Sequence, residues 1–241
     1  MSFPFIEHVV WLHSDGAVWA ARARWRGAAV WREQQDGEPL SACAELLEQA
    51  PRGRLRFLDR ATVLLGFPHV HYLMLPWQTG LYGQADWQGF AQATFSQAVG
   101  IDPQRWHIQV ANAGFGHARL AAAVSLELLQ DLRDLFKLQR LPLVSCTPLL
   151  TAVARQFWQQ LPDDCVLAIP EPHGLSCLYR QHRATHHVCV LQTSPGSTLS
   201  DNLFTADLLA DQHAPVTLIV ANRPVAPWLG PLHPWFAQAP L

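Results

Sequence analysis

Two short turns carry the residues of this chain that could bind a metal–phosphate group. The first turn holds Asp15 and Gly16, and the second holds Glu171 and Gly174. Each turn lies between two apolar segments, which is the pattern of a β-hairpin. In a nucleotide-binding hairpin, backbone N–H groups cradle the phosphates and an acidic residue helps to hold Mg²⁺. An ordinary tight hairpin also uses one acidic residue and one glycine, so both interpretations stay open.

Other features of a nucleotide site are missing from the sequence. The only lysine is Lys137, which is far along the chain from both turns. Neither turn is followed by a Ser/Thr pair, and residues 221–224 read Ala-Asn-Arg-Pro where paired glycines could have held an adenosine. We therefore predict no cofactor, and keep ATP with Mg²⁺ at the two turns as the alternative.

Cysteines and histidines gather at another predicted hairpin. If its turn centres on Arg183, Cys177 and Cys189 lie directly opposite each other. The same segment contains His182, His186 and His187. Zinc sites usually space their ligands more tightly, and two thiols on neighbouring strands are equally explained as small core residues. We predict no metal site.

The sequence offers no nucleophile or acid–base pair with a recognisable partner. It contains no G-x-S-x-G elbow, and no cysteine lies in a catalytic motif with a recognisable partner histidine. Asp163 and Asp164 are adjacent carboxylates, but they precede an apolar segment as a solvated turn would. We predict no catalytic residues and no enzymatic activity.

Composition limits the class of protein. The 241 residues include 17 basic and 19 acidic side chains, with no basic cluster of the kind that binds nucleic acid. No apolar segment reaches the roughly 20 residues that span a bilayer, and the first residues do not resemble a signal peptide. Five cysteines without a C-x-x-C pair favour a reducing compartment. We expect a cytoplasmic chain without nucleic-acid partners or direct membrane insertion.

The elements that would position the two turns occur twice. Three strands, a helix and a strand are predicted over residues 3–59 and again over 165–220. In the first unit the strands are 3–13, 17–25, 28–32 and 54–59, with a helix that Ser41 caps at its N-terminus and that runs to Gln49. In the second unit the strands are 165–169, 175–180, 186–191 and 216–220, with a helix from Thr198 or Ser200 to Ala210.

A further block is inserted in the first half of the chain, after the first unit. It is a β–α–β–β segment over about residues 69–125, with a helix at 86–99 that ends at Gly100. The other predicted elements are strands at 62–67 and 141–146, and helices at 126–139 and 148–160.

Two βββαβ units joined by a helix are typical of the actin-like, ribonuclease-H-like α/β fold. We predict that residues 1–147 form the first half with its insertion. Residues 148–222 would then form the connecting helix and a shorter second half, and residues 223–241 a C-terminal tail.

The tail is apolar, proline-rich and uncharged after Arg223. Its prolines are incompatible with a regular helix or a central strand. A free tail would leave large apolar side chains in water, so we predict that it docks in a groove of its own domain or of a partner. The predicted partner-binding residues are Trp228, Leu229, Trp235 and Phe236.

This order of elements, with the segment Tyr72-Leu-Met-Leu-Pro-Trp77 before the first long helix, resembles a family of bacterial actin-like proteins. These are the PilM, MshI and GspL-type cytoplasmic proteins of type IV pilus, MSHA pilus and type II secretion systems. The resemblance covers residues 1–220 and rests on diffuse hydrophobic motifs. GspL-type proteins continue into a transmembrane helix and a periplasmic domain, so the expectation here is a stand-alone member like PilM.

The resemblance implies a non-catalytic scaffold in the inner-membrane assembly platform of a pilus or secretion system. Its implied location is cytoplasmic and peripheral to the inner membrane. The implied partners are the cytoplasmic segment of a bitopic membrane subunit and an assembly ATPase, since in PilM a peptide of its partner PilN binds a groove of the fold. The alternative is a degenerate actin-like ATPase or kinase relative that binds Mg-nucleotide at the two hairpin turns.

Overall fold

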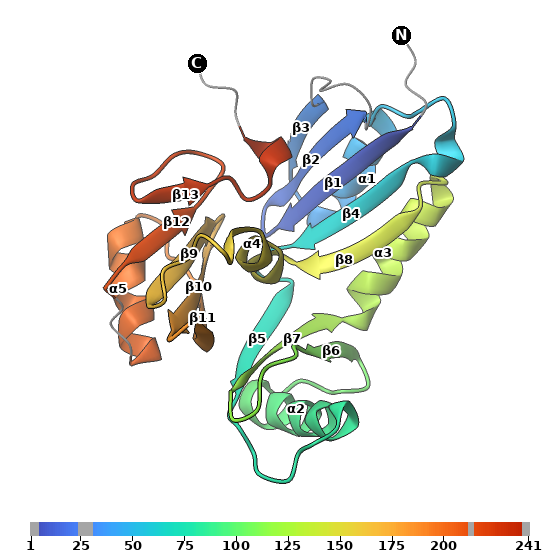
Figure 1. The fold of residues 1–241 in the computed structure, drawn as a ribbon. Coiled ribbons are helices and arrows are strands. Elements are labelled where there is room, and N and C mark those ends of the chain that lie inside the picture. Colours follow the sequence, from blue (N-terminus) through green and yellow to red (C-terminus); the bar gives the residue numbers. More distant parts are fainter. Residues whose placement is uncertain (1–4, 24–30, 212–214, 238–241) are drawn as a thin grey trace.

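The computed structural model describes residues 5–23, 31–211 and 215–237 (Figure 1). These residues form two five-stranded sheets and one three-stranded sheet. Helix α4 (Leu149–Phe157) lies between the two larger sheets, and the smaller sheet extends away from them.

The first sheet has the strand order β3-β2-β1-β4-β8. Strands β1 to β3 are antiparallel, whereas β4 is parallel to β1 and β8 is parallel to β4. Because side chains alternate between the faces of a strand, Val10 and Leu12 of β1 enter one core while Val9 and Trp11 enter another. The strands are β1 (Ile6–His13), β2 (Gly16–Ala23), β3 (Trp31–Asp36), β4 (Arg60–Leu65) and β8 (Leu143–Pro148).

Two helices, α1 (Pro39–Gln49) and α3 (Leu126–Leu138), pack into the core on one face of this sheet. Helix α1 begins after Glu38, whose carboxylate accepts hydrogen bonds from the backbone N–H groups of Leu40 and Ser41. The prediction of Ser41 as the N-terminal cap is therefore wrong. A glutamate reaches the free amides of the first turn as a shorter side chain would, and Pro39 fits the first helical position.

Two strand predictions need correction. Residues 54–59 form no strand: they contain a short 3-10 helix, η1 (Arg56–Leu58), and the paired strand starts at Arg60. The chain bends there because the buried Asp59 carboxylate accepts a hydrogen bond from the Ile6 backbone at 2.8 Å and from Arg52 at 3.0 Å.

The third strand was predicted at residues 28–32, but the described strand is β3 (Trp31–Asp36), and residues 28–30 lie outside the described part of the chain. Pairing with β2 carries β3 through polar residues as far as Asp36, opposite Gly16. An edge strand tolerates such residues, so the apolar alternation that identifies buried strands is missing here.

The second sheet repeats the first, with the order β11-β10-β9-β12-β13. Helix α5 (Leu199–Ala210) covers its outer face. Thr198 caps this helix and forms reciprocal hydrogen bonds with Asp201, which confirms Thr198 of the two predicted helix starts. The repeated βββαβ unit and the actin-like α/β class are thus confirmed. The strands are β9 (Cys165–Glu171), β10 (Gly174–Gln181), β11 (Ala184–Gln192), β12 (Thr217–Val220) and β13 (Trp228–Gly230).

The third sheet is formed between β4 and α3 and has the order β5-β7-β6. Its strands are β5 (Val70–Leu75), β6 (Trp106–Val110) and β7 (Arg119–Ser125). One face packs on helix α2 (Gln84–Val99) around the fully buried Trp87 and Phe95. Its opposite face turns toward the larger sheets, because Tyr72, Met74 and Leu120 pack against the core around α4.

Candidate functional site

The two turns singled out by the sequence face each other. The Ser14 hydroxyl donates a hydrogen bond of 2.8 Å to the Pro172 carbonyl oxygen. The Asp15 carboxylate lies 3.0 Å from Nε2 of His173. Strands β1 and β9 thus bring the predicted residues Asp15, Gly16, Glu171 and Gly174 to one place, and the turns are bonded directly to each other.

Both glycines of these turns have a packing role. A Cβ atom on Gly16 would lie 2.1 Å from the Gln35 carbonyl oxygen, and its φ of +146° is one that other residues rarely adopt. A Cβ atom on Gly174 would lie 2.6 Å from the Phe67 ring. The chain's own atoms therefore occupy the space in front of each glycine.

The Glu171 carboxylate is directed into the protein. One oxygen accepts a hydrogen bond of 2.8 Å from the Phe67 backbone N–H, and the other accepts one of 3.0 Å from the Ser176 hydroxyl. Gly66 makes room for it, because a Cβ atom there would lie 2.0 Å from Glu171 Oε2. Burial raises the pKa of Glu171 to about 7. This carboxylate links the second half to the loop that follows β4.

A small cavity of about 310 Å³ lies beside the two turns. Its lining includes His13, Arg32 and Arg223, and its volume is at the low end for small-molecule sites. Arg32 is already engaged, since its guanidinium donates a hydrogen bond of 2.6 Å to the Phe236 carbonyl oxygen.

The C-terminal segment folds onto its own chain. Phe236 is fully buried in the core that contains Trp11, and Leu229 and Trp235 pack partly buried against the same core. Trp228 lies in the edge strand β13 and is 43% exposed, with its indole N–H donating to the Ala221 carbonyl oxygen. Of the four predicted partner-binding residues, Trp228 alone presents a large exposed side chain.

Cys177 and Cys189 are directly opposed on β10 and β11, as predicted. The turn is formed by His182 and Arg183, and a bulge at Tyr179 and Arg180 adds the one-residue shift that aligns the thiols. Both cysteines are free and buried. In the part of the chain that the structure describes, no three His, Cys, Asp or Glu side chains are grouped so that they could hold a metal ion.

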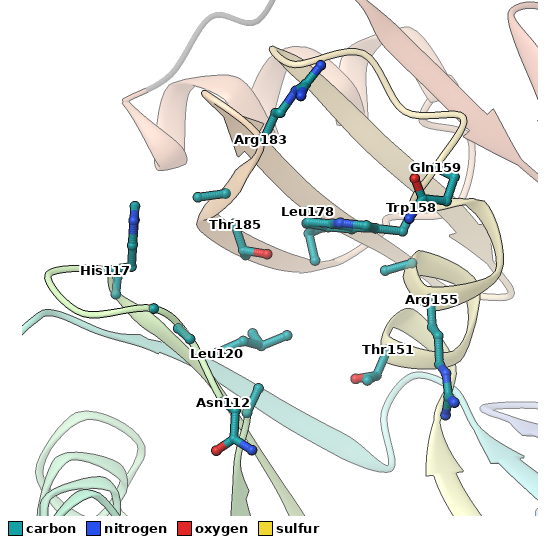
Figure 2. Close-up of a pocket in the computed structure, with 16 residues that line it drawn as sticks. Asn112, His117, Leu120, Thr151, Arg155, Trp158, Gln159, Leu178, Arg183 and Thr185 are labelled. Atoms are coloured by element: carbon teal, nitrogen blue, oxygen red, sulfur yellow. The ribbon is translucent and has the colours of Figure 1, made fainter. Parts of the chain in front are cut away.

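A further candidate site was not predicted from the sequence. It is a cleft of about 750 Å³ between the β6–β7 loop, α4 and the β10–β11 hairpin (Figure 2). Leu120, Leu178 and Trp158 surround its middle, and His117, Arg155 and Arg183 lie at its margin. A smaller cavity of about 200 Å³ shares Ala111, Leu120 and Thr151 with the cleft and extends along β6 and β8.

Trp158 lines this cleft, and Arg180 holds it in place. The Arg180 guanidinium lies 4.4 Å from the centre of its ring and donates hydrogen bonds to the carbonyl oxygens of Trp158 and Leu161. These contacts hold the end of α4 and the indole in place, and a cation over an aromatic face adds stability in a dry environment.

The charged side chains that line the cleft are basic. They are Arg155 and Arg183, and no described residue that lines it is an aspartate or glutamate. Arg183 is paired with Asp163 at 2.8 Å, outside the cleft lining. An apolar floor with cationic margins suits a segment that carries apolar side chains together with carboxylates.

No local motif marks this cleft, because its lining comes from three segments far apart in the chain. The β6–β7 loop reads as a glycine-containing connection and α4 as an amphipathic helix. The only local signal is Trp158 beside Arg155 at the end of a helix.

No family model matches the chain, and no curated protein matches it. Solved structures do. The cytoplasmic domain of EpsL, an inner-membrane component of the type II secretion system of Vibrio cholerae, matches with a TM-score of 0.59 and 12% identity, over 93% of this chain and 84% of that one. A Bacteroides thetaiotaomicron protein with an actin-like ATPase fold and unknown function matches with a TM-score of 0.60 and 7% identity, over 92% and 84%.

The PilM–PilN type IV pilus biogenesis complex also matches, with a TM-score of 0.54 and 12% identity, over 86% of this chain and 66% of that chain. None of the described helices is long and apolar enough to cross a membrane. At these identities the similarity to the solved structures is one of fold. This similarity agrees with the strand order that the two larger sheets share. The chain therefore has the actin-like fold.

Proposed function

We propose that this chain is a non-catalytic actin-like scaffold in the inner-membrane assembly platform of a bacterial type II secretion system or type IV pilus. In this proposal it binds the cytoplasmic segment of a bitopic membrane subunit. The likeness in fold to the EpsL cytoplasmic domain and to PilM, which is solved in complex with PilN, supports this function. The observation that carries it is the cleft between the β6–β7 loop, α4 and the β10–β11 hairpin.

The shape and charge of this cleft support a peptide ligand. Its volume of about 750 Å³ holds several side chains, and its apolar floor can bury them. Arg155 and Arg183 at the margin can each receive a carboxylate, and charge-assisted hydrogen bonds to arginine are among the stronger ones. We therefore expect the bound segment to combine apolar residues with Asp or Glu.

The contacts between the two hairpin turns support the non-catalytic part of the proposal. Ser14 and Asp15 already bond to Pro172 and His173, and Glu171 bonds to Phe67 and Ser176. A phosphate entering between the turns would have to break these contacts, and a metal ion would have to withdraw Glu171 from its buried donors. We propose that no nucleotide is needed for function.

Peptide binding tests the proposal directly. The probes are synthetic peptides of the cytoplasmic segments of membrane subunits encoded beside this chain, labelled and titrated with the purified protein by fluorescence anisotropy. We expect one of these peptides to bind. The double variant Arg155→Glu with Arg183→Glu should lower the affinity for that peptide about tenfold or more. Arg133→Glu, on the exposed side of α3, is the matched control and should leave binding unchanged.

Two results would contradict the proposal. One is the absence of binding by every peptide; the other is binding that the cleft variants leave intact. Calorimetry with Mg-ATP and Mg-ADP tests the non-catalytic part, with Asp15→Ala and Glu171→Ala as controls. Nucleotide binding that both variants abolish would favour the ATPase or kinase alternative.

A further inference from the structure

Helix α5 presents an unusual outer surface. Phe204, Leu208 and Leu209 are 65%, 65% and 64% exposed. The opposite side of the helix, with Ala206 and Ala210, is buried against the second sheet. A helix that is apolar on both sides is normally covered on both sides. Phe204 and Leu208 are four residues apart and so lie one above the other, which makes the exposed apolar surface continuous.

The first half of the molecule provides an internal comparison. Helix α1 has the same place in its βββαβ unit, and its exposed residues are all polar: Ser41, Glu45, Glu48 and Gln49. Beside it, α3 packs into the same core. On the outer face of the second sheet, α5 is the only helix in the described part of the chain, and Figure 1 shows it at the margin of the molecule. The layer that has two helices in the first half has one in the second.

The charge around α5 indicates what could complete this layer. Asp201, Asp207 and Asp211 lie on or at the end of the helix, and no Lys or Arg occurs between Arg183 and Arg223. A second copy placed antiparallel on α5 would bring these aspartates together, and an anionic lipid surface would be repelled. The exposed surface of α5 is therefore complementary to a partner segment that has an apolar stripe with Lys or Arg beside it.

We propose that α5 is a docking surface for an amphipathic helix of a partner protein, with Lys or Arg beside its apolar stripe. The helix would pack on Phe204, Leu208 and Leu209 and take the position beside α5 that α3 has beside α1. This site is separate from the cleft proposed to bind a membrane subunit, so the two proposals succeed or fail independently.

A pair of synthetic peptides tests this inference. Both are helical, about 18 residues long, with leucines at helical spacing. One has lysine at its flanking positions and the other has glutamate. We expect the lysine peptide to bind the full chain at least about tenfold more tightly than the glutamate peptide, measured by fluorescence anisotropy at low salt.

Variants locate the binding site. The double variant Phe204→Ser with Leu208→Ser should bind the lysine peptide about tenfold or more weakly than the natural chain does. Its melting temperature should not be lower, because both side chains are exposed. The matched control is Leu138→Ser, which changes another exposed leucine, on α3. Amide shifts in an NMR titration should be largest over residues 199–211.

Four outcomes would overturn the inference. They are no binding by the lysine peptide, equal binding by both peptides, binding that the α5 variants leave intact, and binding that Leu138→Ser weakens as much. Analytical ultracentrifugation and flotation with phosphatidylglycerol vesicles address the other occupants. A dimer or vesicle binding that is lost in the α5 variants would assign the surface to a second copy or to lipid instead.

Discussion

The Asp15 carboxylate lies 3.0 Å from the His173 imidazole, so the two turns that the sequence offers as phosphate-binding hairpins are joined to each other. Both side chains are about half exposed, and a polar contact in such an exposed position contributes little by itself. The buried bonds of Glu171 behind it contribute more. The first prediction concerns that carboxyl group.

Glu171 should make stability depend on pH. In the folded chain it keeps its proton up to about pH 7, whereas in the unfolded chain it loses it near its ordinary pKa of 4.5. Its contribution to the free energy of unfolding therefore decreases as pH rises through this window, by up to about 3 kcal/mol. Glu171→Gln removes the titration and can keep both hydrogen bonds. Urea unfolding should show that the free energy of unfolding decreases less from about pH 5 to pH 8 in the variant than in the natural chain. An equal decrease in both would contradict this prediction.

Gly16→Ala should destabilise the protein by about 2–4 kcal/mol, because the added carbon meets the Gln35 carbonyl oxygen at a backbone φ unsuited to alanine. The control is Gly89→Ala, in α2, where nothing lies within 4 Å of the added carbon. That change should stabilise by about 0.5–1 kcal/mol through helix propensity. Urea unfolding measures both, and a stable Gly16→Ala chain would show that the β1–β2 turn packs less closely than described.

Phe236→Ala should cost about 3–5 kcal/mol, because the ring is fully buried between the two halves. Trp228→Ala removes a larger side chain that is 43% exposed, and should cost about 1 kcal/mol. The comparison can be made by urea unfolding. If the two changes cost the same, the C-terminal segment is not anchored through Phe236.

The thiols should be almost unreactive in the folded protein. Burial raises the pKa of Cys43 to about 12 and that of Cys146 to about 11, and it also raises the pKa of Cys165, Cys177 and Cys189. A colorimetric thiol reagent at about pH 8 should label the native chain slowly and label all five cysteines rapidly in concentrated urea. Fast labelling of the native chain would mean that a thiol is accessible.

The repeated units could be predicted because strands, turns and caps depend on nearby residues. The opposition of Cys177 and Cys189 was predicted from a turn centred on Arg183, and in the structure a bulge next to the turn is also needed to align them. The bend at Asp59 could not be predicted, since it depends on a hydrogen bond to Ile6, 53 residues away. The cap at Glu38 was missed because a glutamate is an uncommon N-cap.

The candidate sites show the same difference between features set by nearby residues and features set by distant contacts. The two hairpin turns were visible as short patterns, but whether they were open or closed depended on contacts such as Ser14 with Pro172, 158 residues apart. The cleft had no pattern, because Leu120, Trp158 and Leu178 meet only in the folded chain. The exposed surface of α5 was also not predicted, since the helix has apolar residues on the side that meets the sheet and on the side that meets solvent.

The carbonyl oxygen of Phe236 accepts a hydrogen bond from Arg32, so the end of the described chain is fastened to the first sheet. The two halves are thereby connected at several places, which include α4, the paired turns and this C-terminal contact. Rotation of one half against the other would have to break at least two of these connections together. We therefore expect the two halves to move together, so that the cleft and the exposed surface of α5 stay at a constant distance and orientation from each other.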